Sequence, residues 1–293
     1  MILLCTITFL ISFFSLGYAT SYQIEQVTET PKIRVHPGIN NKGEIVWEER
    51  DSDDVMQIYS NKRGKITSNN HDKYYPDINN DEEIVWEEPS YNYVVSNKKG
   101  IIYSGAAHLQ GASINNNGEI IWGEIYYENN EQYFRISSNE QGTLKKSDNI
   151  RYRFPDINKN GIYAWSQIQV NDDSEDWHIY SSDNNKISKD AYYNRNLDPS
   201  INNNNEIFWI NADNNIDSNQ RGKIIPRAGN IWGLDANDKG TIVWAETTGR
   251  NSNDRQIFKA TPNPVPEPTT WLLFATGLLG LAGMGRKKFF SQS

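Results

Sequence analysis

The chain has 293 residues and a formal net charge of −8 at pH 7, with 37 acidic and 29 basic residues. This acidic balance argues against nucleic-acid binding, because nucleic-acid phosphates need a basic footprint. The single cysteine, Cys5, lies in an apolar N-terminal run, so we expect a mature protein without disulfides or cysteine-ligated metals.

The N-terminus has the pattern of a secretory signal. Residues 2–16 are almost continuously apolar, and Gly17-Tyr18-Ala19 follows as a small-x-small cleavage site. The pattern predicts a signal peptide over residues 1–19 that signal peptidase removes. An N-terminal membrane anchor is the alternative, although about 15 apolar residues are short for a span that needs ~20.

The body of the chain is built from a repeated nine-residue segment that ends in tryptophan. Its first copy, residues 39–47, reads Ile-Asn-Asn-Lys-Gly-Glu-Ile-Val-Trp. Six copies follow one another at spacings of 39, 36, 43, 44 and 35 residues, with Trp47, Trp86, Trp122, Trp165, Trp209 and Trp244. A period near 40 residues carried by short strand-like units is the signature of a β-propeller.

Each repeat divides into four short strands. In the second repeat we expect them at residues 74–78, 83–86, 93–96 and 101–103, separated by turns. Four short antiparallel strands in about 40 residues make one propeller blade. The turn before each tryptophan needs a residue that reaches positive φ, and Gly or Asn stands there in five repeats. Glu82 takes this place in the second repeat, so we expect a strained residue or a different turn there.

The last repeat predicts how the ring closes. It lacks a fourth strand and ends in a Pro-rich linker, whereas residues 22–27 alternate like a strand and have no other place. We therefore expect an all-β fold: a six-bladed β-propeller of four-stranded blades over residues 20–261, closed by the N-terminal strand. The tryptophans should fill the spaces between blades, each burying on the order of 200 Å². A ring of sugar-stacking tryptophans is the alternative.

The repeat form Pro-Asp-Ile-Asn-x-x-Gly-x-Ile-x-Trp resembles the TolB-type propeller repeat. The likeness spans the body, but Ile-Asn-Asn-x-Gly stands where that family usually has a Ser-Pro-Asp-Gly turn. The resemblance implies the fold and a binding role, and it leaves the ligand open.

The C-terminus carries a three-part tail. A linker over residues 262–268 ends in Pro266-Glu267-Pro268, an apolar run over 271–284 follows, and Arg286-Lys287-Lys288 comes last. This order resembles the PEP-CTERM sorting signal, which implies that residues 269–293 hold the chain in the inner membrane until an exosortase processes it. The family is typical of bacteria that make extracellular polysaccharide. About 14 apolar residues with four glycines make a marginal permanent span, and the basic cluster should stay cytoplasmic. A buried core helix is the alternative.

Without its two ends the body keeps 26 basic and 36 acidic residues, for a net charge of −10. Such a body suits solubility outside the cell or the attraction of cations.

A first set of candidate binding residues lies on the rim where the connections between strands vary most. Loops of variable length on a rigid scaffold usually carry binding, and Tyr and Arg are enriched at binding patches. The candidates are Tyr74, Tyr75, Arg151, Tyr152, Arg153, Tyr192, Tyr193 and Arg195. The alternative is that these tyrosines only cover the ends of the blades.

A second set is a possible ring of carboxylates two residues after each tryptophan. Symmetry would place them on one annulus, where they could bind cations or glycan hydroxyls. The set is Glu49, Glu88, Glu124 and Glu246, with Gln167 and Asn211 at the same place in the other repeats. Solvated residues just past a strand end are the alternative.

A third candidate is a calcium site at Asp156, Asn158 and Asn160, which fit the first half of an Asp-x-Asn-x-Asn-Gly loop. The twelfth position is Gln167 rather than Glu, and a hairpin turn explains the same residues in every repeat. No other cofactor is expected. The four histidines show no metal-ligand spacing, and no Gly-x-Ser-x-Gly nucleophile elbow is present.

These patterns favour a secreted, transiently membrane-tethered and non-catalytic propeller that binds an extracellular matrix ligand, either exopolysaccharide or protein. It would stand on the periplasmic side of the inner membrane and then reach the cell surface or the matrix. A glycan-active hydrolase or lyase with carboxylates in the central channel is one alternative. A cell-envelope protein-assembly module, as the TolB likeness suggests, is the other.

Overall fold

The computed structural model describes residues 21–105, 108–170, 176–183, 185–188, 192–193, 198–226, 229–249 and 253–263. The regular elements of these residues are strands, and none of these residues belongs to a helix long and apolar enough to cross a membrane. The predicted signal peptide and the C-terminal sorting segment lie outside the described residues. Tyr22–Pro262 forms one compact unit.

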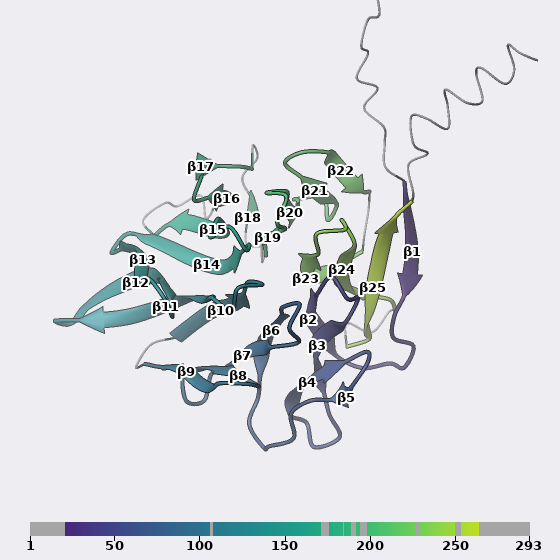
Figure 1. Ribbon diagram of the computed structural model, residues 1–293, viewed down its shortest axis with the longest axis horizontal. Helices are drawn as coiled ribbons and strands as arrows, with labels where there is room; N and C mark the ends of the chain where they lie inside the picture. The colour runs from purple at the N-terminus through teal and green to yellow at the C-terminus, as the bar shows by residue number, and fades with distance from the viewer. Residues whose placement is uncertain are drawn as a thin grey trace, which may run out of the picture. The chain divides into compact units, whose positions relative to one another are not determined.

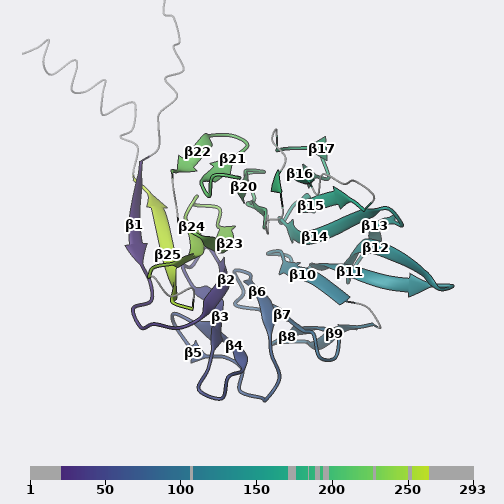
Figure 2. The ribbon, with the colours of Figure 1, turned by 180° about the vertical axis from the view of Figure 1, so that it is seen from behind.

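Six antiparallel sheets stand around one axis, as predicted (Figures 1 and 2). The first three blades follow the chain in order. Their strands are β2 (Arg34–Ile39), β3 (Ile45–Arg50), β4 (Met56–Ser60) and β5 (Gly64–Lys65); β6 (Tyr74–Ile78), β7 (Ile84–Glu88), β8 (Tyr93–Ser96) and β9 (Gly100–Ser104); and β10 (His108–Ile114), β11 (Ile120–Glu128), β12 (Glu131–Ser138) and β13 (Gly142–Ser147).

The fourth blade has one additional short strand, β18, which pairs with β16. The strands of the last three blades are β14 (Ile150–Ile157), β15 (Tyr163–Gln169), β16 (Asp176–Ser181), β17 (Asn185–Lys186) and β18 (Tyr192–Tyr193); β19 (Ser200–Ile201), β20 (Ile207–Ile210), β21 (Ile216–Ser218) and β22 (Gly222–Ile225); and β23 (Ile231–Ala236), β24 (Ile242–Thr247), β25 (Arg255–Pro262) and β1 (Tyr22–Gln26).

The sixth blade takes strands from both ends of the body, which confirms the predicted closure. Strand β1 pairs antiparallel with β25, from Tyr22 opposite Pro262 to Gln26 opposite Phe258. The first strands of the blades contact one another in sequence and form the innermost layer around the axis. They are β2, β6, β10, β14, β19 and β23.

The tryptophans fill the spaces between neighbouring blades, as predicted. Trp165 of the fourth blade, for example, packs against Ile121 and Phe134 of the third blade and is 3% exposed. The six repeat tryptophans are all at most 7% exposed, so they belong to the core rather than to an open stacking ring. Each blade therefore depends on the next one to cover its apolar strands.

The hairpin turn between the first two strands repeats in every blade. The position before the second strand is left-handed even in the second blade, where Glu82 has a φ of 61°, against 71° for Gly43. Glu82 is thus the strained residue in the common turn, one of the two outcomes that the sequence allowed.

Candidate functional site

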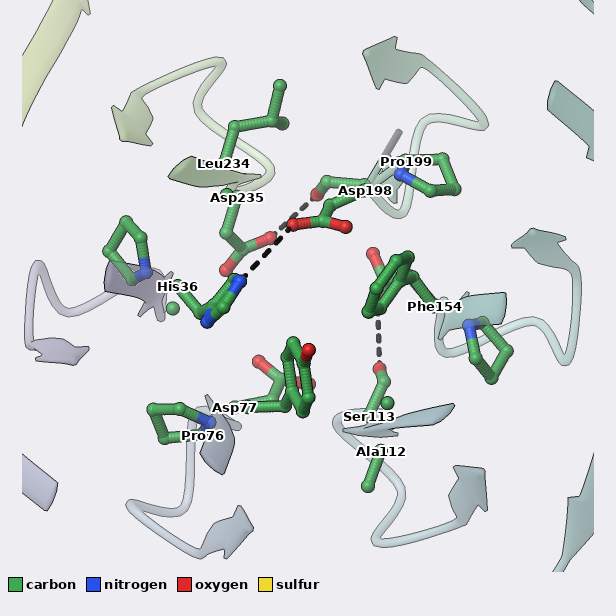
Figure 3. A pocket seen from close by; sticks show the side chains of 18 residues that line it. His36, Pro76, Asp77, Ala112, Ser113, Phe154, Asp198, Pro199, Leu234 and Asp235 are labelled. Carbon is green, nitrogen blue, oxygen red and sulfur yellow. Dashed lines mark hydrogen bonds and ion pairs between the residues drawn. The ribbon is translucent and has the colours of Figure 1, made fainter. Parts of the chain in front are cut away.

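The innermost strands surround a pocket on the propeller axis (Figure 3). Each innermost strand contributes the three residues that precede the Ile or Ala at the start of its nine-residue repeat. The six segments are 36–38, 75–77, 111–113, 154–156, 198–200 and 233–235. We name the first member of each segment a mouth residue: His36, Tyr75, Gly111, Phe154, Asp198 and Gly233.

A β-bulge places most of the mouth residues. The strand register shifts at this point in five of the six blades. His36, Tyr75 and Phe154 take left-handed φ angles of 46°, 53° and 50° there. Such a backbone costs a residue with a side chain about 1–2 kcal/mol. Three residues with a strained backbone gathered in one pocket are typical of a functional site. Bulges change the direction of side chains, and backbone strain persists only where the surrounding structure imposes it.

Two polar atoms at the mouth are buried without a hydrogen-bond partner among the described residues: His36 Nε2 and Asp198 Oδ1. The other ring nitrogen, His36 Nδ1, lies 2.7 Å from Glu48 Oε1, which also accepts from the backbone N–H of Tyr75 at 2.6 Å. His36 Nε2 stands 3.9 Å from Asp198 Oδ2, too far for a hydrogen bond. Figure 3 marks this ion-pair contact with a dashed line; we call His36 and Asp198 the unused polar pair because one polar atom of each has no hydrogen-bond partner in the described part of the chain.

Burial and charge shift the protonation of this pair. Burial alone would lower the pKa of His36, but the carboxylates of Glu48 and Asp198 outweigh it, so the pKa is raised above its usual value. Burial raises the pKa of Asp198 to about 6, against the opposing charges of His36 and Arg153. At neutral pH the imidazole thus tends to the charged form while Asp198 can still ionise.

The two glycines among the mouth residues set the spacing of the others. A Cβ on Gly233 would lie 2.8 Å from His36 Cα, and one on Gly111 would lie 3.0 Å from Phe154 Cα. Because Gly233 lies between the blades of Asp198 and His36, its missing side chain lets these two approach. Gly111 likewise separates Tyr75 from Phe154, whose ring centroids are 5.3 Å apart. The mouth thus has a polar pair, His36 and Asp198, and an aromatic pair, Tyr75 and Phe154.

Below the mouth lies a layer that we name the axial triad: Asp77, Asp156 and Asp235, from alternate blades. Each carboxylate accepts from its own blade and from the next, as Asp77 does from Ile78 N (2.7 Å) and Ile114 N (2.8 Å). Burial and the neighbouring carboxylates raise the pKa of Asp77 to about 7, and burial also raises those of Asp156 and Asp235.

The opposite end of the axis carries a circuit of side-chain amides, the asparagine ring: Asn40, Asn79, Asn115, Asn158, Asn202 and Asn237. In five of these, Nδ2 donates to the backbone oxygen of the next member at 3.1–3.3 Å. Each Oδ1 accepts from two backbone N–H groups of its own turn. These bonds hold each turn internally and link one blade to the next.

Some of the predicted rim residues lie at or near the mouth in the structure, and others do not. Tyr74 and Tyr75 lie on the innermost strand β6 and residues 151–153 lie on β14, whereas Tyr192 and Tyr193 form β18, which pairs with β16. Tyr75 is a mouth residue, and the charge of Arg153 acts on both Tyr75 and Asp198 while its guanidinium stacks 4.8 Å from the Trp177 ring.

The other rim residues stand apart from the mouth. Tyr74 donates to Asp72, Arg151 lies over the Phe134 ring, and Tyr152 is buried between the third and fourth blades. The side chains of Tyr192 and Tyr193, and the whole of Arg195, lie outside the described residues.

The predicted carboxylates sit on second strands and cap the tryptophans. Glu49, Glu88, Glu124 and Glu246 each accept from the indole N–H two residues earlier, at 2.9–3.2 Å, and Gln167 does the same at 2.9 Å. Glu49 and Glu124 are 3% and 0% exposed and also accept from Arg34 and Arg135. Their oxygens are thus used by bonds within their own blades, and none of the four lines the pocket on the axis.

The oxygens of the predicted calcium site are used by the turn. Asp156 accepts from Ser113, Ile157 and Ile201, and Asn158 Oδ1 accepts from the N–H groups of Asn160 and Ile162. Bonds within the turn and from the two neighbouring blades therefore use the oxygens of Asp156 and Asn158 that a calcium ion would need. Within the described parts of the chain, no three His, Cys, Asp or Glu side chains are grouped to hold a metal.

Sequence reasoning missed His36, Glu48, Phe154 and Asp198. A signal was present: the position three before the conserved Ile or Ala of the repeat reads His, Tyr, Gly, Phe, Asp, Gly. This position varies in chemistry from repeat to repeat, while neighbouring positions are uniform. Such variation marks a position that packing between blades does not constrain.

The comparisons with known proteins agree with the fold and the tail. Residues 264–287 match the PEP-CTERM protein-sorting motif, so the protein is exported and sorted by a membrane route. No curated protein matches the chain. A gluconolactonase from Xanthomonas campestris is similar in structure, with a TM-score of 0.58 and 6% identity over 85% of this chain and 93% of that one. A protein of unknown function from Dyadobacter fermentans has a TM-score of 0.50 and 10% identity, covering 82% and 99%. At these identities the likeness shows the propeller fold alone.

Proposed function

We propose that this exported propeller binds a ligand of the extracellular matrix, exopolysaccharide or protein, in the pocket at the mouth of its axis, without catalysing a reaction. Before processing by an exosortase, the C-terminal tail would tether it to the periplasmic face of the inner membrane. The product would then act at the cell surface or in the matrix.

The observation that carries the proposal is the unused polar pair of His36 Nε2 and Asp198 Oδ1. A buried polar atom without a partner costs about 1–3 kcal/mol, so a ligand that pairs both atoms recovers this free energy. The strained backbone of His36, Tyr75 and Phe154 supports the same conclusion, since it re-aims these side chains toward one point.

Binding of the full-length protein to exopolysaccharide and matrix protein from its host tests the proposal. We expect Asp198→Asn and His36→Ala to weaken binding at least tenfold. Glu82→Gln is the matched control, because it changes an exposed carboxylate in a turn at the asparagine-ring end. Equal binding by the mouth variants and the control would contradict the proposal.

A glycan-active hydrolase or lyase is the second candidate. Glu48 holds His36 by Nδ1 and leaves Nε2 without a hydrogen bond to the described residues, 3.9 Å from Asp198 Oδ2, and a carboxylate at Nδ1 is how a histidine is oriented for proton transfer. Release of reducing ends or unsaturated products from the polysaccharide, lost in His36→Ala, would favour this candidate over binding alone. The gluconolactonase name of a structural neighbour adds gluconolactone as a test compound only.

A further inference from the structure

We infer that the mouth pocket binds the terminal, uncharged sugar of a glycan, and that one hydroxyl of this sugar bridges His36 Nε2 and Asp198 Oδ1. The inference rests on the proposed function and names the class of ligand. It follows from three features of the pocket: the hydrogen-bonding character of the polar pair, the aromatic pair, and the position on the axis.

The polar pair presents one donor and one acceptor. His36 Nδ1 faces the Glu48 carboxylate at 2.7 Å, and Nε2 faces Asp198 at 3.9 Å. A ring with a carboxylate at each nitrogen is stabilised as the cation, in which both nitrogens donate. When Asp198 is ionised it has no proton to donate, so Oδ1 acts only as an acceptor. A hydroxyl is the group that accepts from one partner and donates to the other at the same time.

Ligands of either charge fit this pocket poorly. Uronates, sulfates and phosphates would face the carboxyl groups of Asp198 and Glu48, both of which are buried beside the axis. A protonated amine would face the cationic His36 ring as well as Asp198. Repulsion at short range in a buried site is poorly screened, so an uncharged hydroxyl-bearing ligand is favoured.

Aromatic rings next to the polar pair supply apolar contact. The Tyr75 ring lies 4.4 Å from the His36 ring and 5.3 Å from the Phe154 ring, centroid to centroid. Pro76, Pro155 and Pro199 also line the pocket. Aromatic faces with a few convergent polar groups bury the C–H face of a ring and fix its orientation.

The pocket lies on the axis, with one innermost strand on each of six sides. An internal sugar of a chain would need a second exit past the axial triad, two of whose carboxylates accept from serines of the preceding blade, and past the asparagine ring, whose amides bond from blade to blade. A terminal sugar needs only the one opening. The geometry therefore points to recognition of chain ends.

The test measures competition with the host polysaccharide for the full-length unmutated protein. The competitors are a neutral hexose, its series of single-deoxy analogues, a uronate and an amino sugar. We expect the neutral hexose to compete, one deoxy analogue to lose about 10- to 100-fold in affinity, and the uronate and amino sugar to be weaker than the hexose. Asp198→Asn should remove the difference between the hexose and that analogue. The deoxy series requires no mutation, so it remains decisive if a variant fails to fold.

The outcomes separate this inference from the proposed function. Polysaccharide binding that no neutral sugar reduces, or that the uronate or amino sugar reduces better, overturns the inference and leaves the proposed function standing. The inference is also overturned if none of the deoxy analogues loses affinity. Failure to bind any polysaccharide or matrix protein removes the proposed function itself.

Discussion

The two ends of the propeller axis are made from neighbouring positions of the same repeat, yet they differ in kind. At one end six asparagines form a ring in which repeated bonds tie each turn internally and blade to blade. At the other end the mouth residues share no chemistry, and two of their buried polar atoms have no partner among the described residues. Uniform positions stabilise the closed ring, whereas varied positions leave strain and unpaired atoms that a ligand can use.

The largest expected effect comes from breaking the asparagine ring. Asn79→Ala removes two acceptor bonds, from Asp81 N and Glu83 N, and the donor bond to Asn115 O, at a side chain only 3% exposed. We expect a loss of about 3 kcal/mol in the free energy of unfolding, measured by chemical denaturation.

The matched change at the other end is Asp198→Asn, where a buried carboxylate oxygen is unpaired. It should change the free energy of unfolding by less than about 1 kcal/mol, or raise it, because function rather than stability uses this atom. A large loss of stability in Asp198→Asn, or none in Asn79→Ala, would contradict the contrast between the two ends.

A smaller loss of stability, with loss of binding, should follow Gly233→Ala. The added Cβ would lie 2.8 Å from His36 Cα at a φ of 81°, so either the bulge or the His36 backbone must move. We expect about 2 kcal/mol of destabilisation and loss of ligand binding, measured by denaturation and by the competition assay.

Gly43→Ala is the control for Gly233→Ala. Gly43 has a similar φ of 71°, lies in a turn of the asparagine-ring end and has no atom within 4 Å of the added Cβ. It should cost about 1 kcal/mol and leave binding unchanged. If the two variants bind alike, Gly233 does not position His36.

The contrast also explains what the sequence could predict. The blade count, the strands of the second repeat and the closing strand followed from periodicity and turn residues, because packing between identical units forces these positions to repeat. The tryptophans were predicted in the core for the same reason.

The site was less predictable because it depends on contacts across the axis. His36 and Asp198 are 162 residues apart in sequence, and the spacing between them depends on a glycine in a third blade. Glu48 and Glu49 are adjacent in sequence, but only the strand register shows that one meets His36 and the other caps Trp47. Spacing alone gives no such information.

The layer between the two ends should make stability depend on pH. Burial and the Asp235 carboxylate raise the pKa of Asp77 to about 7, and burial raises to about 8 the pKa of Glu87, which accepts from the backbone N–H of the mouth residue Gly111. The folded state therefore binds protons that the unfolded state releases near pH 4, and this stabilisation is lost as pH rises through the folded pKa values. We expect the melting temperature to fall by roughly 5 °C between pH 5.5 and pH 9.

Asp77→Asn sharpens this prediction. The variant removes a group that titrates in the folded state but keeps one acceptor oxygen, so it should be less stable than the unmutated protein at pH 5.5 and should show a shallower fall toward pH 9. A melting temperature that rises over this range would show that the axial triad is ionised in the folded protein.

The smallest expected effect is a gain in stability at Glu82, which lies in a turn at the asparagine-ring end of the axis. Glu82 has a φ of 61° in a turn where four other blades have Gly and one has Asn. Glu82→Gly removes left-handed strain of about 1–2 kcal/mol and loses an exposed ion pair with Lys42, while the unfolded chain gains entropy. We expect a net gain of about 0.5 kcal/mol in the free energy of unfolding and unchanged ligand binding. The corresponding strained residue of the mouth, His36, should respond in the opposite way: His36→Gly relieves its backbone too, but it removes the ring that the pocket requires and should abolish binding. If Glu82→Gly weakened binding as His36→Gly does, strain at the two ends would not serve different purposes.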